Sequence, residues 1–378
     1  PHEAKGEIRA LLFWCVLRSL WSKVRNKLRW HFFPGLFKGF SKMFGLEFAP
    51  LNIPMKRRLQ TAAVLQWCLS FLLLGHSCCI LAVVLLFTRW WWFSLLYACW
   101  VFFYDLDTPH RGGRRVQWVR NWTVWKYMAK YFPMELVKST DLDPEKNYVF
   151  GFHPHGVLGA GAFVNFSTEG THFSEKFPGI RPHLLILSGI FWMPWHRDYV
   201  MTSGCCAVSR ESVEWILTRQ GTGNAAVIVI GGAIEVLDAM PGKCTLTLKK
   251  RKGFIRMAMK HGADLVPVYS FGENEMYTQV KNPPGSFIRK FQTKVQRFTG
   301  FATPLFHGRG VFQYTFGIVP YRKPIHTIVG TPIPVEKNEN PTEEEVVALQ
   351  KKYIAELTVL FDKYKGLYNM EDHELDIQ

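Results

Sequence analysis

The chain has 378 residues, enough for one large domain or two ordinary ones; 48% are hydrophobic and 15% aromatic, a composition that suggests contact with a membrane. Its formal net charge of +16 suits a negatively charged partner, such as anionic lipid or a phosphorylated cofactor. Nucleic acid is disfavoured because no basic helix accompanies an aromatic base-stacking motif, and the basic residues gather near apolar segments instead.

Residues 1–58 form a basic N-terminal segment with twelve Lys or Arg and three Glu, interleaved with Leu, Phe and Trp. This pattern is typical of an amphipathic segment on an anionic membrane surface. A disordered basic arm would have the same composition, so both interpretations stay open.

Residues 59–106 are expected to form a hydrophobic membrane hairpin. Positions 61–87 are 27 residues without a formal charge, more than the roughly 20 that a helix needs to cross the hydrocarbon core. A second apolar run, at 90–104, has 15 residues, which is short for a full crossing. Basic residues flank the pair and only Arg89 lies between the runs, so the positive-inside rule places both termini in the cytosol. The alternative is a pair of buried core helices.

Two tripeptides, beginning at Asn121 and Asn165, match the acceptor pattern for N-glycosylation. If the hairpin has this orientation, neither asparagine is exposed to the glycosylation machinery. We therefore expect both to be unmodified.

Residues 107–378 have the mixed pattern of a cytosol-facing α/β domain. Apolar runs at 148–152, 225–230, 265–271 and 325–329 predict buried strands separated by helices or loops. The expected fold is α/β, with a mixed or mostly parallel sheet covered by helices. A final helix is predicted to start at a capping box from Thr342 to Glu345, and its apolar face is interpreted as a packing surface.

The strand at 148–152 leads into two histidines, His153 and His155, on either side of Pro154. Proline cannot continue a central strand, and the following Gly156 permits a tight turn or a close approach by another group. An imidazole at a strand end suits a general base, because its ordinary pKa of about 6.5 lets it exchange protons near neutrality. The structural alternative is a core histidine followed by a turn histidine.

The strand at 225–230 has a similar ending, with Gly231 and Gly232 followed by Glu235. If the two strands are neighbours, His155 and Glu235 meet at one sheet edge, where the carboxylate would orient the imidazole and stabilise the imidazolium. Alternatively, Glu235 is a first-turn residue that the helix dipole favours.

For two charged clusters the sequence allows either a binding role or a structural role. Lys249, Lys250, Arg251 and Lys252, with Arg256, could bind the phosphates of a nucleotide-bearing donor or form a solvated face. A second cluster follows an aromatic loop and could position a substrate or form a local ion pair; it comprises Arg197, Asp198 and Tyr199.

Direct transfer, without a covalent acyl-enzyme, fits these residues best. The chain has no Gly-x-Ser-x-Gly elbow, and its eight cysteines indicate neither a reactive thiol, a zinc site nor a disulfide framework. A histidine base, a membrane anchor and a basic surface suit attack by a lipid hydroxyl on acyl-CoA. No metal or further cofactor is expected, because acyl-CoA is a co-substrate.

The sequence resembles the type-2 diacylglycerol acyltransferase family, which includes monoacylglycerol acyltransferases and wax synthases. The resemblance runs from about Phe48 to the C-terminus and rests on His153-Pro-His-Gly156, Arg197-Asp-Tyr199, Gly231-Gly-Ala-x-Glu235, Arg251-Lys-Gly-Phe254 and Ser270-Phe-Gly-Glu-Asn274. It implies a multi-pass endoplasmic reticulum enzyme, also compatible with lipid droplets, that transfers acyl groups from acyl-CoA to glycerides. By this resemblance His155 is the base, Glu235 its partner and His153 a supporting residue.

Two stretches, beginning at Glu47 and Pro304, look closer to monoacylglycerol acyltransferases. The expected acceptor is therefore 2-monoacylglycerol, with diacylglycerol as the first alternative and a non-catalytic lipid-binding scaffold as the second. A homo-oligomer is compatible with the sequence.

Overall fold

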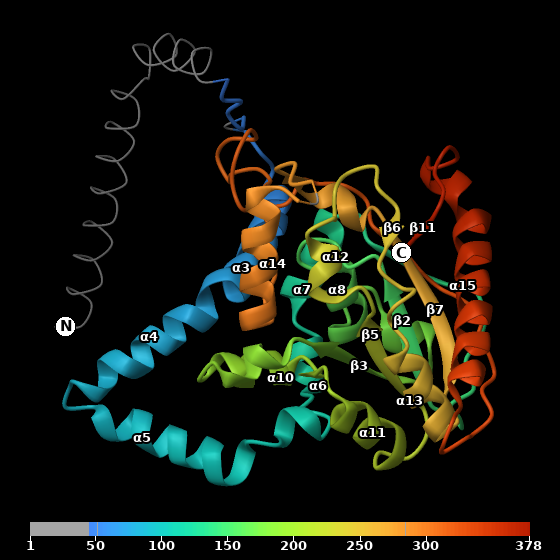
Figure 1. The fold of residues 1–378 in the computed structure, drawn as a ribbon. Helices are drawn as coiled ribbons and strands as arrows, with labels where there is room; N and C mark the ends of the chain where they lie inside the picture. Colours follow the sequence, from blue (N-terminus) through green and yellow to red (C-terminus); the bar gives the residue numbers. More distant parts are fainter. Residues whose placement is uncertain (1–44, 51, 284) are drawn as a thin grey trace, which may run out of the picture. The chain divides into compact units, whose positions relative to one another are not determined.

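The computed structural model describes residues 45–50, 52–283 and 285–378 (Figure 1). The chain divides into two compact units. In the described part of the smaller unit, Phe48 forms an antiparallel bridge with Gln313. The larger unit contains Pro50–Val311 and Phe316–Gln378, and it holds the sheet, its helices and all the predicted site residues. Most of the predicted basic segment, residues 1–44, lies outside the described residues.

A seven-stranded mixed sheet forms the centre of this unit, in the order β1-β10-β7-β2-β5-β3-β4. Neighbouring strands are parallel except for β10 and β7, which are antiparallel. The α/β prediction is therefore confirmed. The strands are β1 (Glu135–Lys138), β2 (Tyr148–His153), β3 (Arg181–Ile186), β4 (Cys205–Ala207), β5 (Asn224–Val229), β7 (Asp264–Phe271) and β10 (His326–Val329).

The four predicted strands are present as β2, β5, β7 and β10, whereas β1, β3 and β4 were not predicted. Strand β3 begins Arg-Pro-His, which contradicts an apolar strand pattern, but its position between β5 and β4 buries it. Tertiary position thus overrides local composition there. Two short pairs complete the strands: β6 (Thr245–Leu246) with β11 (Asp376–Ile377), and β8 (Thr278–Gln279) with β9 (Phe306–His307).

Helices cover both faces of the sheet. Because side chains alternate along a strand, Phe150 and Phe152 face one core and Val149 faces the other. The first core also contains side chains of α3 (Met55–Leu69), α7 (Thr123–Tyr131) and α8 (Ala160–Ser167). The second contains side chains of α11 (Arg210–Thr218), α13 (Gly253–His261) and α15 (Glu343–Lys365).

The predicted final helix is α15, and it begins at the predicted capping box. The hydroxyl of Thr342 accepts a hydrogen bond from the amide of Glu345 at 3.2 Å, and the Glu345 carboxylate accepts one from the Thr342 amide at 2.8 Å. Its expected apolar face is buried against the sheet at Val346, Tyr353 and Leu357. The packing prediction for this helix is confirmed, with one addition at Tyr353 described below.

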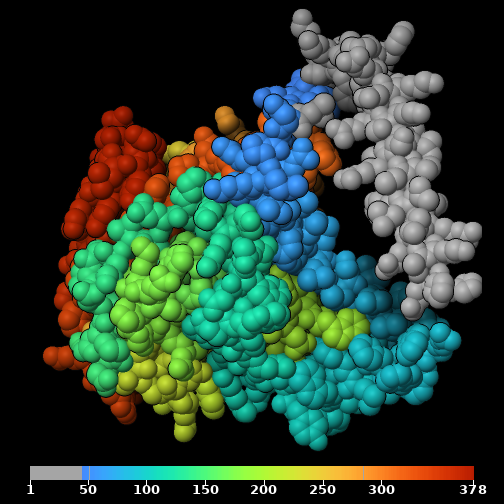
Figure 2. All heavy atoms as spheres, turned by 180° about the vertical axis from the view of Figure 1, so that it is seen from behind, coloured from blue at the N-terminus to red at the C-terminus, as the bar shows by residue number. Residues whose placement is uncertain are grey.

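The hydrophobic segment is helical. Helix α3 continues through the π-helical turn η1 (Ser70–Leu74) into α4 (Gly75–Leu86), and this helix, Met55–Leu86, is long and apolar enough to cross a membrane. Helix α5 (Trp91–Trp100) and the π-turn η2 (Val101–Asp105) follow, and α5 contacts α4 through a hydrogen bond from the Ser94 hydroxyl to the Ala82 carbonyl at 3.0 Å. Figure 1 shows the two helices diverging from the turn that joins them, and Figure 2 shows the same segment in blue and cyan from behind. The side chains of α4 are mostly exposed, whereas Trp67 of α3 is buried in the core. The boundary between exposed and core-facing surface therefore lies within one continuous helix.

One longer helix, α14, and several short helices and turns make up the remaining regular structure of the described residues. They are η3 (Thr108–His110), α6 (Gln117–Arg120), α9 (Phe173–Lys176), η4 (Ser188–Trp192), α10 (His196–Thr202), α12 (Gly232–Val236), η5 (Glu273–Met276), α14 (Phe287–Thr299) and η6 (Gly366–Tyr368).

Candidate active site

His153 is the last residue of β2, and its side chain is completely buried. Its Nε2 lies 3.0 Å from the hydroxyl of Tyr353, and this hydroxyl donates its single proton to the carbonyl of Gly151 at 3.1 Å. Nε2 of His153 must therefore be the donor to the tyrosine oxygen. Burial lowers the pKa of His153 to about 3, so this imidazole stays neutral and is a weak base.

His155 lies two residues further on and is half-buried. Its Nδ1 is 3.1 Å from the carbonyl oxygen of Gly156, so Nδ1 carries the proton and Nε2 has the free lone pair. No hydrogen bond to Nε2 is present among the described residues. Burial lowers the pKa of His155, and the contact with Gly156 offsets part of that change. A neutral imidazole with an open Nε2 is the form that can accept a proton.

Glu235 is buried in α12. The strand that ends at His153, β2, pairs with β5, the strand that precedes Gly231, so the condition for the two motifs to meet is fulfilled. Oε1 of Glu235 accepts a hydrogen bond from the backbone amide of His155 at 2.6 Å, and Oε2 accepts one from the amide of Thr247 at 2.9 Å. The carboxyl group thus meets the backbone of His155, where the sequence led us to expect contact with the ring. Burial raises the pKa of Glu235 to about 7, although these hydrogen bonds oppose the rise.

The glycines of the two motifs leave room for carboxyl groups. A Cβ atom on Gly231 would lie 2.1 Å from an oxygen of Glu235, whose side chain folds back over the turn. A Cβ atom on Gly156 would lie 2.7 Å from Cγ of Glu273, and Gly156 also has a φ of +64°. At both positions any larger residue would displace a buried carboxyl group.

Glu273 is a second buried carboxyl group under the histidine loop. Its Oε2 accepts a hydrogen bond from the amide of Gly161 at 3.0 Å, in the first turn of α8, and lies 3.4 Å from the hydroxyl of Ser270. Oε1 has no hydrogen-bond partner among the described residues. Burial raises the pKa of Glu273 to about 8, so the group is mostly protonated at neutral pH.

The predicted basic cluster separates into three parts. Arg251 donates to the carbonyl of Gly231 at 3.0 Å, which places its guanidinium beside the glycine turn. Lys252 and Arg256 both form ion pairs with Glu343. Lys249 and Lys250 are exposed. Of the five basic residues, Arg251 therefore lies next to the Glu235 turn, whereas Lys252 and Arg256 are engaged by α15.

The cluster at Arg197 connects α10 to the hydrophobic helices. The guanidinium of Arg197 is buried and donates to the Asp105 carboxylate at 2.6 Å and to the Asp105 carbonyl at 2.8 Å. Asp198 instead accepts from Arg114 at 2.9 Å and from Tyr97 at 2.5 Å. Arg197 and Asp198 therefore do not pair with each other, as one of the two open interpretations had it, because Arg197 has a carboxylate partner 92 residues away.

Tyr199, the third member, accepts a hydrogen bond from the side chain of Gln66 at 3.0 Å. All three residues of this motif thus contact the segment between α3 and Arg114. Their recorded contacts are structural, and none joins the two histidines.

Two site residues were not found from the sequence. Tyr353 was assigned to packing, because a tyrosine on an apolar helix face has no local sign of a polar contact. Glu273 lies within Ser270-Phe-Gly-Glu-Asn274, which entered only through the family resemblance. A polar residue directly after a strand, as in the other two motifs, was the signal that could have identified it.

Known proteins resemble this chain over most of its length. A family model described as Diacylglycerol acyltransferase matches residues 83–378. The 2-acylglycerol O-acyltransferase 1 of Bos taurus is 54% identical over 87% of this chain and 98% of its own length. Diacylglycerol O-acyltransferase 2 of Homo sapiens is 50% identical over 85% of this chain and 83% of its own. Among solved structures, the 1-acyl-sn-glycerophosphate acyltransferase PlsC of Thermotoga maritima aligns with a TM-score of 0.34 and 12% identity, covering 78% of this chain and 97% of that one.

These matches establish the class: the protein is an acyltransferase enzyme of glycerolipid synthesis. It belongs to the diacylglycerol acyltransferase family, and the family prediction from the sequence is confirmed. Because the relatives include both 2-acylglycerol and diacylglycerol acyltransferases at similar identity, family membership leaves the acceptor open.

Proposed function

We propose that the enzyme transfers a fatty acyl group from acyl-CoA to the hydroxyl of 2-monoacylglycerol, forming diacylglycerol, with His155 as general base. The observation that carries this proposal is the state of the His155 ring. Nδ1 is engaged by a carbonyl and Nε2 is open, in a half-buried position beside the loop that Glu235 holds. The buried and neutral His153 supports the strand end through Tyr353 and does not take part in proton transfer.

The reaction is a single displacement. Nε2 of His155 takes the proton from the acceptor hydroxyl while its oxygen forms a bond to the thioester carbon. The carbon–sulfur bond breaks, and the imidazolium returns the proton to the CoA thiolate. Backbone amides near Gly156 or Gly231 would stabilise the developing oxyanion. Glu235 is a positioning residue, because it acts on the backbone of His155 and not on the reacting atoms.

Arg251 is our first candidate for contact with the acyl-CoA phosphates. Its guanidinium lies beside the Gly231 turn, and it is free of the ion pairs with Glu343 that engage its neighbours. Lys249 and Lys250 could add longer-range attraction because they are exposed. Arg197 and its neighbours are proposed to join the hydrophobic helices to the catalytic unit, which keeps the acceptor entrance near the bilayer.

The membrane arrangement is a further part of this proposal. Helix Met55–Leu86 and α5 would form a hairpin in the endoplasmic reticulum membrane, with both termini in the cytosol. Asn165 is buried and its amide donates to the Thr327 hydroxyl at 2.8 Å, in agreement with an unmodified side chain. Expression in cells followed by glycosidase treatment tests this orientation: a mobility shift that depends on Asn121 would overturn it.

Acyl transfer by purified protein in nanodiscs tests the catalytic proposal. His155→Ala should lower activity by at least a hundredfold. His172→Asn is the matched control, because His172 is exposed with a φ of +61°, which asparagine tolerates. Activity in His155→Ala within tenfold of normal would exclude His155 as the base.

The same assay decides the acceptor when 2-monoacylglycerol and diacylglycerol are offered separately with labelled acyl-CoA. Diacylglycerol as the preferred acceptor would support the first alternative. A complete lack of transfer to either glyceride would favour the lipid-binding scaffold.

A further inference from the structure

An open cavity of about 620 Å³ lies beside the amino-terminal ends of β3 and β5. None of the described residues that line it is acidic. Several carry hydrogen-bond donors, namely Arg115, Gln117, Ser174, Arg181, His183 and Gln220. The catalytic proposal uses none of these residues.

The cavity and the catalytic loop lie at opposite edges of the sheet. Strand β3 runs parallel to β5, which runs parallel to β2, and the pairings place Arg181 level with Asn224 and Tyr148 level with Ala225. Arg181 is therefore near the start of β2, whereas His155 follows its end. A strand of this length spans roughly 20 Å. The cavity is thus distinct from the proposed acyl-transfer site.

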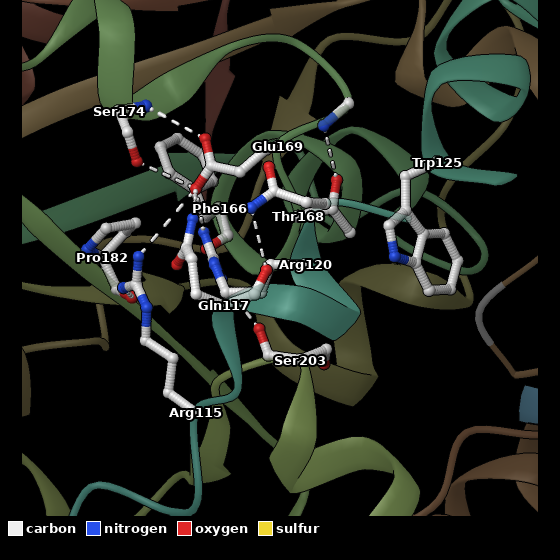
Figure 3. A network of polar contacts seen from close by, with 12 residues as sticks. Arg115, Gln117, Arg120, Trp125, Phe166, Thr168, Glu169, Ser174, Pro182 and Ser203 are labelled. Atoms are coloured by element: carbon white, nitrogen blue, oxygen red, sulfur yellow. Dashed lines mark hydrogen bonds and ion pairs between the residues drawn. The ribbon is translucent and has the colours of Figure 1, made fainter. Parts of the chain in front are cut away.

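Behind the cavity, two arginines share one carboxylate (Figure 3). Arg120 is completely buried and lies 3.2 Å from Oε1 of Glu169. Arg115 is largely buried, lies 3.9 Å from the same oxygen and donates to the carbonyl of Pro182 at 3.1 Å. Glu169 also accepts from the amide and the hydroxyl of Ser174. Two guanidinium groups, one completely and one largely buried, therefore share a single negative charge.

A third guanidinium group, that of Arg181, increases the excess of positive over negative charge around the cavity. Arg181 is exposed on its rim and has no ion pair among the described residues. Burial and, next, repulsion from Arg120 lower the pKa of Arg115 to about 9, although the attraction of Glu169 opposes this change. Arginine nevertheless keeps its proton in proteins, so the positive charge persists without full compensation. His183 contributes no charge, because burial and then Arg115 lower its pKa to about 3.

We propose that this cavity is a binding site for a phosphate monoester, with Arg115 and Arg181 as its cationic ligands. Guanidinium groups offer paired donors that match phosphate oxygens, and a bound phosphate would supply the missing negative charge. The amides of Gln117 and Gln220 and the hydroxyl of Ser174 provide further polar groups around the same space. The cavity volume is within the range of small-ligand sites, so it accommodates a phosphorylated small molecule as well as the phosphate itself.

Ligand-dependent thermal stability and titration calorimetry on the full chain in nanodiscs test the site. AMP and adenosine form one pair of probes, since they differ by the phosphate. Dihexanoyl phosphatidic acid tests whether a lipid headgroup is the better source of the same group. The site predicts stabilisation by AMP or phosphatidic acid at matched ionic strength, and none by adenosine. The probe that binds more tightly identifies the source of the phosphate.

Arg181→Gln should weaken that binding at least tenfold, whereas Arg181→Lys should retain part of it. Arg181 is chosen for substitution because its side chain is exposed and forms no ion pair among the described residues, so the variant should fold normally. Lys351→Gln, an exposed charge on α15, is the matched control and should bind as the unaltered protein does. Acyl transfer should persist in Arg181→Gln, which separates this site from the catalytic one. Three results would overturn the proposal: no stabilisation by either AMP or phosphatidic acid, stabilisation by adenosine as large as that by AMP when AMP does stabilise the protein, or unchanged phosphate binding in Arg181→Gln.

Discussion

Glu235 contacts His155 through the backbone: its Oε1 accepts the amide proton of His155 at 2.6 Å, while its Oε2 accepts that of Thr247 at 2.9 Å. The carboxyl group therefore determines where the loop places the imidazole, and the ring tautomer is determined separately by the carbonyl of Gly156. Different groups therefore control the position of the imidazole and which of its two nitrogens carries the proton.

Glu235→Gln should reduce kcat by at least tenfold. A glutamine has a single acceptor oxygen, so one of the two backbone amides would face an NH2 group and lose its buried hydrogen bond, a cost of about 1–3 kcal/mol. Glu275→Gln is the matched control, because Glu275 also accepts a backbone amide, that of Gly242 at 2.7 Å, but in an exposed position. Activity of Glu235→Gln equal to that of Glu275→Gln would contradict the positioning role.

Tyr353→Phe should lower the thermal stability of the protein. Removing the hydroxyl leaves His153 Nε2 and the Gly151 carbonyl without this partner in the core, and an unsatisfied buried polar group costs about 1–3 kcal/mol. Tyr127→Phe on α7 serves as the control, since the Tyr127 hydroxyl makes no hydrogen bond with any residue that the structure describes. The measurement is the Tm of each variant in the same detergent; equal Tm values for the two would count against the His153–Tyr353 link.

Glu273→Gln should flatten the dependence of stability on pH. Burial raises the pKa of Glu273 from 4.5 to about 8, so the folded protein retains a proton that the unfolded chain releases near pH 4.5. The contribution of this group to the free energy of unfolding is therefore fully present below about pH 4.5 and decreases as the pH rises to about 8.

In Glu273→Gln this titration is absent, and Tm should change less between these pH values than in the unaltered protein. Glu235 also has a raised pKa, but it is present in both proteins and cancels from the comparison. The polar groups that act on the Glu273 carboxyl are the amides of Gly161 and Ala160 and the hydroxyl of Ser270, and none of them is charged, so the sign of the effect is that of burial. An identical pH profile in the two proteins would show that Glu273 is ionised in the fold.

Arg251→Gln should raise the KM for acyl-CoA at least fivefold, because Arg251 is the proposed phosphate contact and lies beside the Gly231 turn. Arg256→Gln is expected to change this KM less than twofold, since Arg256 is engaged by Glu343 on α15. Steady-state kinetics with varied acyl-CoA make the comparison. The reverse order of the two effects would assign phosphate binding to Arg256.

Much of the architecture was readable from local patterns. Apolar runs predicted the central strands β2, β5 and β7, because a strand buried on both faces needs a continuous apolar sequence. The capping box predicted the start of α15, since its hydrogen bonds join residues three apart. Strand β3 was not predicted, because its Arg-Pro-His start has no strand pattern. It is buried only because β5 and β4 lie on either side of it.

The sequence by itself determined which residues stand at the ends of strands. The sheet topology, in which β2 pairs with β5, brought His155 and Glu235 to one edge. Tertiary structure decided the contacts they make there: Glu235 with a backbone amide, His153 with Tyr353, and Arg197 with Asp105. The physical reason is that periodicity and turn chemistry act over a few residues. A hydrogen bond between residues 80 to 200 positions apart depends on strand register and on how each helix lies over the sheet.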